Sequence, residues 1–452
     1  MSPIAIQAIQ FFISLSFLIV LHELGHFIPA KLFKTRVEKF YLFFDVKYAL
    51  FKKKIGETEY GIGWLPLGGY VKISGMIDES MDTEAMKQDP QPWEFRSKPA
   101  WQRLIIMLGG VTVNFVLAVI IFIGMAFSYG EQYIPNESVK DGYQVTDQEI
   151  GEKLGIQTGD RIIAVDGNSI KTFRGIFLEI VNGNTITIER DGALQEVEIP
   201  VDFIETLLDN PDRMRFLAMR QPFVVSGHDP DHIVNPEVDF QAMDQVLSIN
   251  GETAFYLDQA KDILARNKGQ EVSLLVERAN GSQTILMAQV NDSATLGVSL
   301  QSLTMQQFVD KGLIEIETKS YSLIESIPVG IERGVTTLGS YVKQLKKIFN
   351  PETGAYKGVG GFAAIGGLFP DVWDWQAFWG TTALLSVILA FMNILPIPAL
   401  DGGHVLFLLY EMISGRKPSD KFLEYAQMVG FFILMGLLLF ANGNDLYKLI
   451  FK

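Results

Sequence analysis

Cysteine is absent from this chain of 452 residues. Its absence excludes disulfide bonds, thiolate metal sites and a cysteine nucleophile. Basic charge is also in the minority, because 38 Lys and Arg residues stand against 52 Asp and Glu residues, a formal net charge of −14. A nucleic-acid partner requires a basic surface, so this balance argues against one.

Charge is missing altogether from four long apolar stretches, and 48% of the chain is hydrophobic. About 20 apolar residues suffice to cross the hydrocarbon core of a bilayer, so each stretch predicts a transmembrane helix. A cleaved signal peptide is the alternative for the first stretch, which lacks the basic start and the cleavage site that such a peptide needs. We therefore expect four retained spans, which extend a few residues beyond the uncharged stretches, at residues 1–27, 104–128, 375–404 and 425–446.

Basic residues near the ends of these spans predict the orientation of the chain, since loops rich in Lys and Arg stay on the cytoplasmic side. They gather after the first span, before the second, and between the third and fourth. We therefore expect both termini, and the long segment between the second and third spans, on the extracytoplasmic side. The residues concerned are Lys31, Lys34, Arg36, Lys39, Arg96, Lys98, Arg103, Arg416, Lys417 and Lys421.

The predicted cytoplasm-side segment, residues 28–103, contains a candidate β-hairpin. Residues 56–75, GETEYGIGWLPLGGYVKISG, alternate small and apolar residues around the turn signal PLGG at 66–69. No charged residue occurs between Glu59 and Lys72. A loop in water usually carries charge, so we expect this hairpin to touch lipid or to pack beside the spans.

The segment between the second and third spans carries an internal repeat. GIQTGDRIIAVDGNSI (155–170) is similar to FQAMDQVLSINGETA (240–254), at a spacing of about 83 residues. Each contains a short strand pattern that ends in a D-G or N-G turn, and further strand patterns follow. We interpret residues 130–222 and 223–320 as two copies of one small α/β domain.

The repeated pattern resembles bacterial PDZ domains, whose signature corresponds to GDRIIAVDG at 159–167. The second copy departs from that signature, with AMDQ at 242–245 where Gly-Asp-Arg is usual. The resemblance implies domains that bind extended peptide ends by adding a strand to a sheet edge. A small β-rich domain that binds nothing is the alternative.

Residues 321–374 connect the repeat to the third span. Five apolar residues within 331–349 share one helical face, with lysines elsewhere, and this pattern is typical of an interfacial helix. The glycine-rich, apolar segment 358–370 predicts irregular structure beside the membrane. The five apolar residues are Val335, Leu338, Val342, Leu345 and Phe349.

The sequence HELGH at 22–26 places ionisable residues at the end of the first span. His22 and His26 are four residues apart, so both imidazoles lie on one helical face and can converge on one zinc ion. Glu23 beside them can act as a general base on a zinc-bound water. Two core histidines with an ion-paired glutamate are the alternative, but ionisable groups in a span are costly and usually functional.

A catalytic zinc usually has three protein ligands, so a third is expected at similar depth on another span. The segment MNILPIPALDGGH (392–404) offers Asn393, Asp401 and His404, and its two prolines interrupt the helix. We expect Asp401 to be the third ligand, with His404 as the other candidate. A helix cap or an ion pair is the non-catalytic alternative for Asp401.

The motif HExxH on the first span, with N-x-x-P-x-P-x-L-D-G on a later one, resembles the site-2 protease family of intramembrane zinc metalloproteases. The PDZ-like pair between spans two and three extends the resemblance over almost the whole chain. It implies that His22, His26 and Asp401 bind Zn²⁺ and that Glu23 is catalytic. It also implies that Asn393 helps to hold the substrate near the zinc.

Two further elements take part in the resemblance. The hairpin at 56–75 is similar to a membrane-reentrant β-loop that presents an edge to the substrate. The family motif G-P-x-x-N reads GVTVN at 110–114, where the asparagine is present and the proline is not. A substrate-binding role is thereby implied for Asn114, with a hydrogen bond between spans as the alternative. The hairpin residues with an implied substrate contact are Gly61, Gly63, Gly68 and Gly69.

The resemblance implies a polytopic α-helical membrane protein with four transmembrane helices, a membrane-reentrant β-hairpin and two extracytoplasmic PDZ-like α/β domains. Its expected place is the bacterial inner membrane. The expected substrates are single-span membrane proteins whose outer domain has already been trimmed, such as anti-sigma factors in a stress response, and remnant signal peptides. Peptide ends at the PDZ-like domains and the lipid bilayer are the other expected partners.

Two other functions stay open from the sequence. A membrane-anchored zincin could act on misfolded protein, although it would not need Asp401 on a later span. A PDZ-bearing membrane scaffold would be no enzyme, although it would not need Glu23. A second histidine pair, His228 and His232, has Pro230 between its members, so we expect an exposed loop there.

Overall fold

The computed structural model of the chain describes residues 2–76, 89–209 and 211–451. Part of the predicted cytoplasm-side segment, residues 77–88, thus lies outside the described residues. The chain divides into two compact units. The first unit consists of residues 1–130, 320–349 and 356–452, and the second of residues 131–319 and 350–355.

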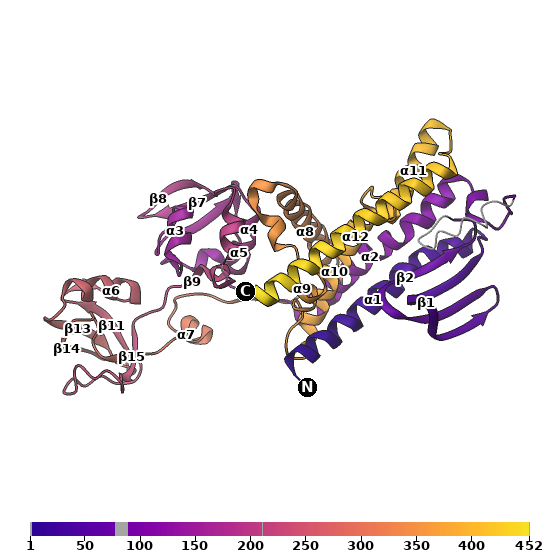
Figure 1. Cartoon of the computed structure of the whole chain (residues 1–452). Helices are drawn as coiled ribbons and strands as arrows, with labels where there is room; N and C mark the ends of the chain where they lie inside the picture. Colours follow the sequence, from indigo (N-terminus) through magenta and orange to yellow (C-terminus); the bar gives the residue numbers. More distant parts are fainter. Residues whose placement is uncertain (1, 77–88, 210, 452) are drawn as a thin grey trace. The chain divides into compact units, whose positions relative to one another are not determined.

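Long helices form the first unit (Figure 1). Among the described residues, four helices are long and apolar enough to cross a bilayer, and one corresponds to each predicted span. Figure 1 shows α1, α2 and α12 running along a common direction. The four helices are α1 (Pro3–Leu32), α2 (Ala100–Tyr129), α10 (Trp375–Ile394) and α12 (Asp420–Phe451).

The third span is shorter than the prediction of 375–404. Helix α10 ends at Ile394, residues 395–400 are irregular, and α11 (Asp401–Ser414) is a separate helix. Two prolines at 396 and 398 account for the break, because proline lacks an N–H and disfavours helical backbone in the residue before it. Asn393 and Asp401 therefore lie on two different helices.

Helix α2 is central in the first unit, because it packs against α1, α8, α10 and α11. Its contact with α1 is close: a Cβ atom at Gly25 would lie 2.4 Å from the carbonyl oxygen of Gly109. Small residues allow such approach between helices in membranes. The other helices of this unit are α8 (Leu323–Phe349) and α9 (Phe362–Gly366).

A bent sheet of two long strands, β1 (Val37–Ile55) and β2 (Thr58–Ile73), packs beside α1. Residues 39–42 have partners on both sides: residues 69–72 run antiparallel to them, and residues 59–62 run parallel to them. Residues 49–55 pair with 58–63. Residues 69–73 are therefore one outer edge of the sheet.

The chain reverses direction where the turn of this hairpin is predicted. Residues 59–62 run parallel to 39–42 and residues 69–72 run antiparallel to them, so the reversal lies between 62 and 69, where Gly68 has a φ of +154°. The chain also reverses at Gly56 and Glu57, where Gly56 has a φ of +62° that favours glycine. The two arms of the predicted hairpin do not pair with each other but lie on either side of 39–42, so the sheet spans 37–73 rather than 56–75.

The second unit begins and ends on paired strands, β3 (Glu131–Tyr133) and β16 (Glu317–Lys319). Its first module contains a four-stranded sheet of order β6-β5-β7-β8 and a separate pair, β4 with β9. Its elements are β4 (Tyr143–Val145), α3 (Gln148–Leu154), β5 (Arg161–Val165), β6 (Asn168–Ser169), α4 (Ile176–Asn182), β7 (Thr185–Arg190), β8 (Ala193–Glu198), α5 (Phe203–Asp209) and β9 (Leu217–Met219).

The second module contains the strand order β14-β13-β11-β10-β15, with β12 paired to β11. Both modules thus run strand, short strand, helix and two strands along the chain. Its elements are β10 (Val224–His228), β11 (Asp244–Ile249), β12 (Glu252–Thr253), α6 (Leu257–Arg266), β13 (Glu271–Glu277), β14 (Gln283–Gln289), β15 (Val298–Leu300) and α7 (Met305–Asp310). Short 3₁₀ helices occur at Phe95–Ser97, Asn136–Ser138, Phe173–Gly175, Pro211–Arg215, Pro351–Thr353 and Ala355–Gly358.

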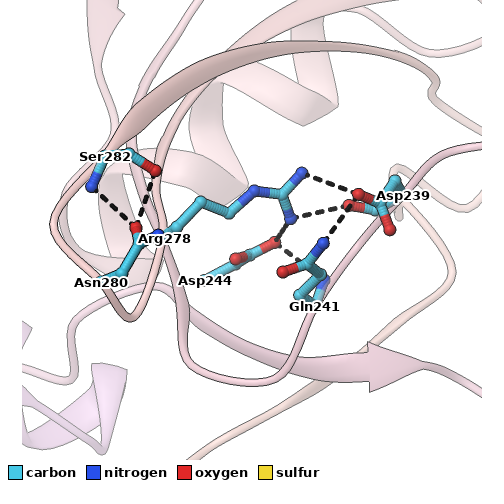
Figure 2. A network of polar contacts seen from close by, with 6 residues as sticks. All are labelled: Asp239, Gln241, Asp244, Arg278, Asn280 and Ser282. Atoms are coloured by element: carbon cyan, nitrogen blue, oxygen red, sulfur yellow. Dashed lines mark hydrogen bonds and ion pairs between the residues drawn. The ribbon is translucent and has the colours of Figure 1, made fainter.

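Both modules contain the same hydrogen-bonded group, here called the aspartate–arginine clasp, in which an aspartate accepts hydrogen bonds from an arginine and from a backbone N–H. In the second, the buried carboxylate of Asp244 accepts hydrogen bonds from Arg278 Nη1 at 2.6 Å and from the backbone N–H of Gln241 at 2.8 Å (Figure 2). In the first, Asp160 accepts from Arg190 Nη2 at 2.6 Å and from a backbone N–H at 2.7 Å. The second copy has therefore kept the aspartate of the sequence signature.

The departure of the second copy lies beside that aspartate. Met243 stands where the first copy has Gly159, and both have positive φ, +68° and +100°. The left-handed region is costly for a residue with a Cβ atom, so the clasp holds Met243 in a backbone that glycine adopts freely.

The core of the first module includes residues assigned by sequence to the second copy. Leu303, Phe308 and Ile314 are buried in one cluster with Tyr143, Ile162 and other residues of the first module. The predicted boundary at 222/223 therefore does not separate two cores. The first module obtains part of its apolar cover from α7 and the residues around it.

Candidate metal centre and active site

Helix α1 presents His22 and His26 on one face, one turn apart. Their Nε2 atoms lie 3.2 Å apart, and their ring centroids lie 4.9 Å apart. His26 is buried, and its Nδ1 atom lies 2.8 Å from the carbonyl oxygen of Ile106 on α2. A histidine that holds a metal through Nε2 usually donates its other N–H to such an acceptor.

Asp401 completes the group from the first residue of α11. Its Oδ2 atom lies 3.3 Å from Nε2 of His22 and 3.3 Å from Nε2 of His26. Donor atoms about 2.0 Å from a tetrahedral zinc ion lie about 3.3 Å from one another, so the three spacings match such an ion. Within the described part of the chain, this Oδ2 atom is buried and has no hydrogen-bond partner.

Two imidazole nitrogens and one carboxylate oxygen are a donor set that suits zinc with one position left for water or substrate. Among the described residues, His22, His26 and Asp401 form the one group whose donor atoms converge in this way. His404, the other candidate for the third ligand, lines the neighbouring cavity but is not in this group. The irregular segment 395–400 turns α11 so that Asp401 faces α1.

Glu23 lies between the two histidines in sequence and faces the sheet. Its carboxylate interacts with the backbone N–H of Val71 in β2. Gly69 lets the strand approach this closely, because a Cβ atom there would lie 2.5 Å from Ile19 Cγ2 and 3.4 Å from Glu23 Cγ. The outer edge of the sheet, residues 69–73, therefore runs directly beside the HExxH turn.

A cavity of about 530 Å³ joins these groups. Its wall contains His22, Glu23, His26 and Asp401 together with Asn114, Asn393 and residues 68–73. The structure thus brings together residues that the sequence selected on four helices, α1, α2, α10 and α11, and on strand β2. Asn393 Nδ2 lies 3.4 Å from His22 Nε2, on the side that faces the other ligands.

Two of the four selected glycines do not line the cavity. A Cβ atom at Gly61 would lie 2.3 Å from the ring of Tyr41, and one at Gly63 would lie 2.2 Å from the carbonyl oxygen of Phe44. Both glycines therefore serve packing within the bent sheet. Gly68 and Gly69 line the cavity wall, and a substrate contact at these two positions stays a prediction.

Sequence reasoning missed a polar cluster on the same cavity wall. Lys39 Nζ lies 2.9 Å from Asp45 Oδ2, and the Tyr70 hydroxyl donates to Asp45 Oδ1 at 2.7 Å. Burial acts to raise the pKa of the Asp45 carboxyl, but the hydrogen bonds from Lys39 and Tyr70 outweigh it and hold that pKa below its ordinary value. Lys39 and Asp45 enclose the uncharged aromatic run FYLFF at 40–44, and this pattern was the available signal.

Sequence reasoning also missed the requirement for glycine at position 110. A Cβ atom at Gly110 would lie 2.4 Å from His26 Nε2 and 2.5 Å from His22 Cε1. The pair Gly109-Gly110 inside an uncharged span was the signal that could have found it. Helix α2 passes so close to the imidazoles that position 110 has no room for a side chain.

Metal donors and a carboxylate beside them, on helices that can span a bilayer, define the class of membrane zinc metalloproteases. The chain belongs to Peptidase family M50, the site-2 protease family, because the sequence model of that family matches residues 10–437. It is accordingly a zinc-dependent, membrane-embedded protease.

Named relatives are similar to this chain over almost their whole length. The chain is 26% identical over 470 residues to the regulator of sigma-E protease RseP of Escherichia coli, covering 97% of this chain and 98% of the relative. It is 24% identical over 463 residues to metalloprotease MmpA of Caulobacter vibrioides, covering 98% and 96%. A Clostridium perfringens protein that carries the name of a zinc metalloprotease is 28% identical over 440 residues, covering 96% of each chain.

Proposed function

We propose that this protein cleaves single-span membrane proteins within the bilayer of the bacterial inner membrane. The substrates are anti-sigma-type proteins already cut at a first site, or remnant signal peptides. One observation carries the proposal: an open sheet edge, residues 69–73, runs beside Glu23 in the cavity that contains His22, His26 and Asp401.

The side chains of this cavity divide the work of hydrolysis. His22, His26 and Asp401 hold the zinc, which when bound polarises the scissile carbonyl and lowers the pKa of water. Glu23 takes a proton from the attacking water and delivers it to the leaving amine. Asn393, on the same side of His22 as the other ligands, holds the substrate backbone in place.

The open edge of β2 supplies what a helical substrate loses when it unwinds. A helix hides its scissile carbonyls in its own hydrogen bonds, and unsatisfied backbone groups are costly in lipid. An extended substrate segment paired with residues 69–73 regains backbone hydrogen bonds next to Glu23, in the manner of strand addition. A membrane-reentrant position of β1 and β2 brings this edge to the depth of the site.

The second unit selects what reaches the site. Its two modules are PDZ-like domains on the extracytoplasmic side, and they recognise exposed peptide ends or exclude substrates with a bulky outer domain. Their repeated element order supports this reading. Both chain termini lie on the same side of the membrane as these modules.

The test is cleavage of a single-span reporter whose outer domain has been removed, in membranes, with wild type, Glu23→Gln and Asp401→Ala. Loss of a general base lowers the rate by about 100- to 10,000-fold. A zinc chelator should abolish cleavage, and added zinc should restore it. His232→Ala is the matched control. The His232 side chain is 78% exposed, and neither His228 nor His232 lines the cavity.

Cleavage that persists in Glu23→Gln would refute the proposed mechanism. Cleavage of soluble unfolded protein in place of the spanning reporter would favour the membrane-anchored zincin. Zinc binding without cleavage of either substrate would favour the scaffold.

A further inference from the structure

Two asparagines flank His22 on opposite sides of its ring. Asn393 lies next to Nε2, the atom that faces His26 and Asp401, whereas Asn114 Nδ2 lies 3.2 Å from Nδ1. The two side chains therefore cannot have the same role. Asn393 is placed toward reacting groups, and Asn114 is placed behind the ligand.

Asn114 is held in position by its neighbours. The residue is fully buried on α2, and its backbone carbonyl accepts a hydrogen bond from Ser386 of α10 at 2.7 Å. Its side-chain oxygen Oδ1 is buried without a hydrogen-bond partner among the described residues. A buried amide oxygen without a partner is costly, so it indicates that a donor should be near.

The proton on His22 supplies that donor. An imidazole that binds a metal through Nε2 carries its proton on Nδ1 and needs an acceptor there. His26 has such an acceptor in the Ile106 carbonyl. Turning the Asn114 amide by 180° exchanges its two outer atoms, because Oδ1 and Nδ2 occupy equivalent places around Cγ.

We propose that Asn114 is a positioning residue whose side-chain oxygen accepts a hydrogen bond from Nδ1–H of His22. This inference rests on the zinc site of the proposed function and replaces the substrate contact expected for Asn114. Helix α2 then supports both histidine ligands, through a carbonyl for His26 and an amide for His22. The amide holds the tautomer that leaves Nε2 free for the metal.

The experiment measures zinc affinity of the full chain in detergent by competition with a chromophoric chelator, so it needs no substrate. Asn114→Leu removes the acceptor at similar volume, and we expect a loss of about 10- to 100-fold, as for other outer partners of metal ligands. Asn114→Asp keeps an acceptor oxygen, so its affinity should stay within a few-fold of wild type. Asn114→Ala serves as the second acceptor-free variant, because a smaller side chain fits wherever leucine is too large.

Ser14→Ala is the matched control. Ser14 of α1 accepts a buried interhelical hydrogen bond from Thr382 of α10 at 2.9 Å and contacts neither imidazole, so its loss should leave zinc affinity unchanged. Unchanged affinity in Asn114→Leu and Asn114→Ala would overturn the inference, as would an equal loss in Asn114→Asp. Wild type that binds no zinc would instead refute the proposed function.

Discussion

At the scale of single residues, the space between α1 and α2 decides whether the ligand group can form. His26 cannot move away from α2, because its Nδ1 atom lies 2.8 Å from the Ile106 carbonyl. The nearest atoms to a Cβ at Gly110 belong to the two imidazoles themselves. Even one methyl group at this position would therefore collide with the two imidazoles themselves, and not with a flexible side chain that could move away.

Gly110→Ala should lower zinc affinity by at least tenfold and abolish cleavage, because its Cβ atom would lie 2.4 Å from His26 Nε2. Zinc content of the purified chain is the measurement. Gly124→Ala is the control on the same helix, where no atom lies within 4 Å of the added Cβ. Equal zinc content in the two variants would contradict the geometry described for α2.

At the scale of elements, β2 contributes an edge rather than a side chain. Residues 69–73 have sheet partners on one side, at 37–42, and face α1 on the other. The approach depends on Gly69, whose Cβ would meet both Ile19 and the Tyr41 carbonyl. A change at this position therefore moves the strand while the ligands of α1 and α11 stay in place.

Gly69→Val should reduce reporter cleavage by at least tenfold while zinc content remains at the wild-type level, because the strand edge shifts by about an ångström or more from Glu23. The two quantities are measured on the same membranes. Leu50→Ala is the control on the opposite outer segment of the sheet, where the side chain is 67% exposed. Loss of zinc in Gly69→Val would show that the strand supports the metal site itself.

A second element-scale contact ties α11 to α2. Arg103 Nη2 lies 2.5 Å from Glu411 Oε1, and their side chains are 8% and 19% exposed. Removing one partner of a buried pair typically costs about 3–5 kcal/mol, whereas replacing both by apolar residues costs little. Glu411→Ala should therefore lower the melting temperature clearly, and Arg103→Met with Glu411→Leu should recover most of it. A double variant no more stable than Glu411→Ala would contradict this expectation. It would show that the ion pair itself stabilises the fold more than two apolar side chains in the same place.

At the scale of the whole molecule, the chain separates into a unit that contains His22, His26 and Asp401 and an α/β unit with its own apolar clusters. The donors described above all belong to the first unit. The aspartate–arginine clasps belong to the second, one in each module. A substitution in one aspartate–arginine clasp should therefore destabilise its own module and leave the first unit unchanged.

Asp244→Asn should destabilise the second module, because Asp244 is fully buried and its loss leaves Arg278 paired with the 70% exposed Asp239 in place of a buried carboxylate. Limited proteolysis should then cut within residues 223–300 at lower protease concentration than in wild type. Zinc content should be unchanged. A loss of zinc would show that the two units depend on each other.

Local patterns allowed much of the fold to be predicted. Four uncharged stretches correspond to four helices long enough for a bilayer, because span length is set by bilayer thickness and is visible in any single segment. Two of the strand patterns that follow the repeated segments, TITIER at 185–190 and EVSLLVER at 271–278, fall on β7 and β13 for the same reason, since alternation is a local property. The reversal between 62 and 69 also agrees with its local turn signal, whereas the position of 39–42 between the two arms depends on pairing that no local pattern contains.

The sequence by itself determined that His22 and His26 share a face, since helical periodicity requires it, and it narrowed the third donor to two residues. Only the tertiary structure brought the Asp401 carboxylate, and not His404, into one group with His22 and His26. It also placed the edge at 69–73 beside Glu23 and covered the first module with Leu303 and Phe308. The physical reason is distance along the chain. Spacing within one helix or strand follows from backbone geometry, whereas contacts between residues hundreds of positions apart depend on how the helices and the sheet pack.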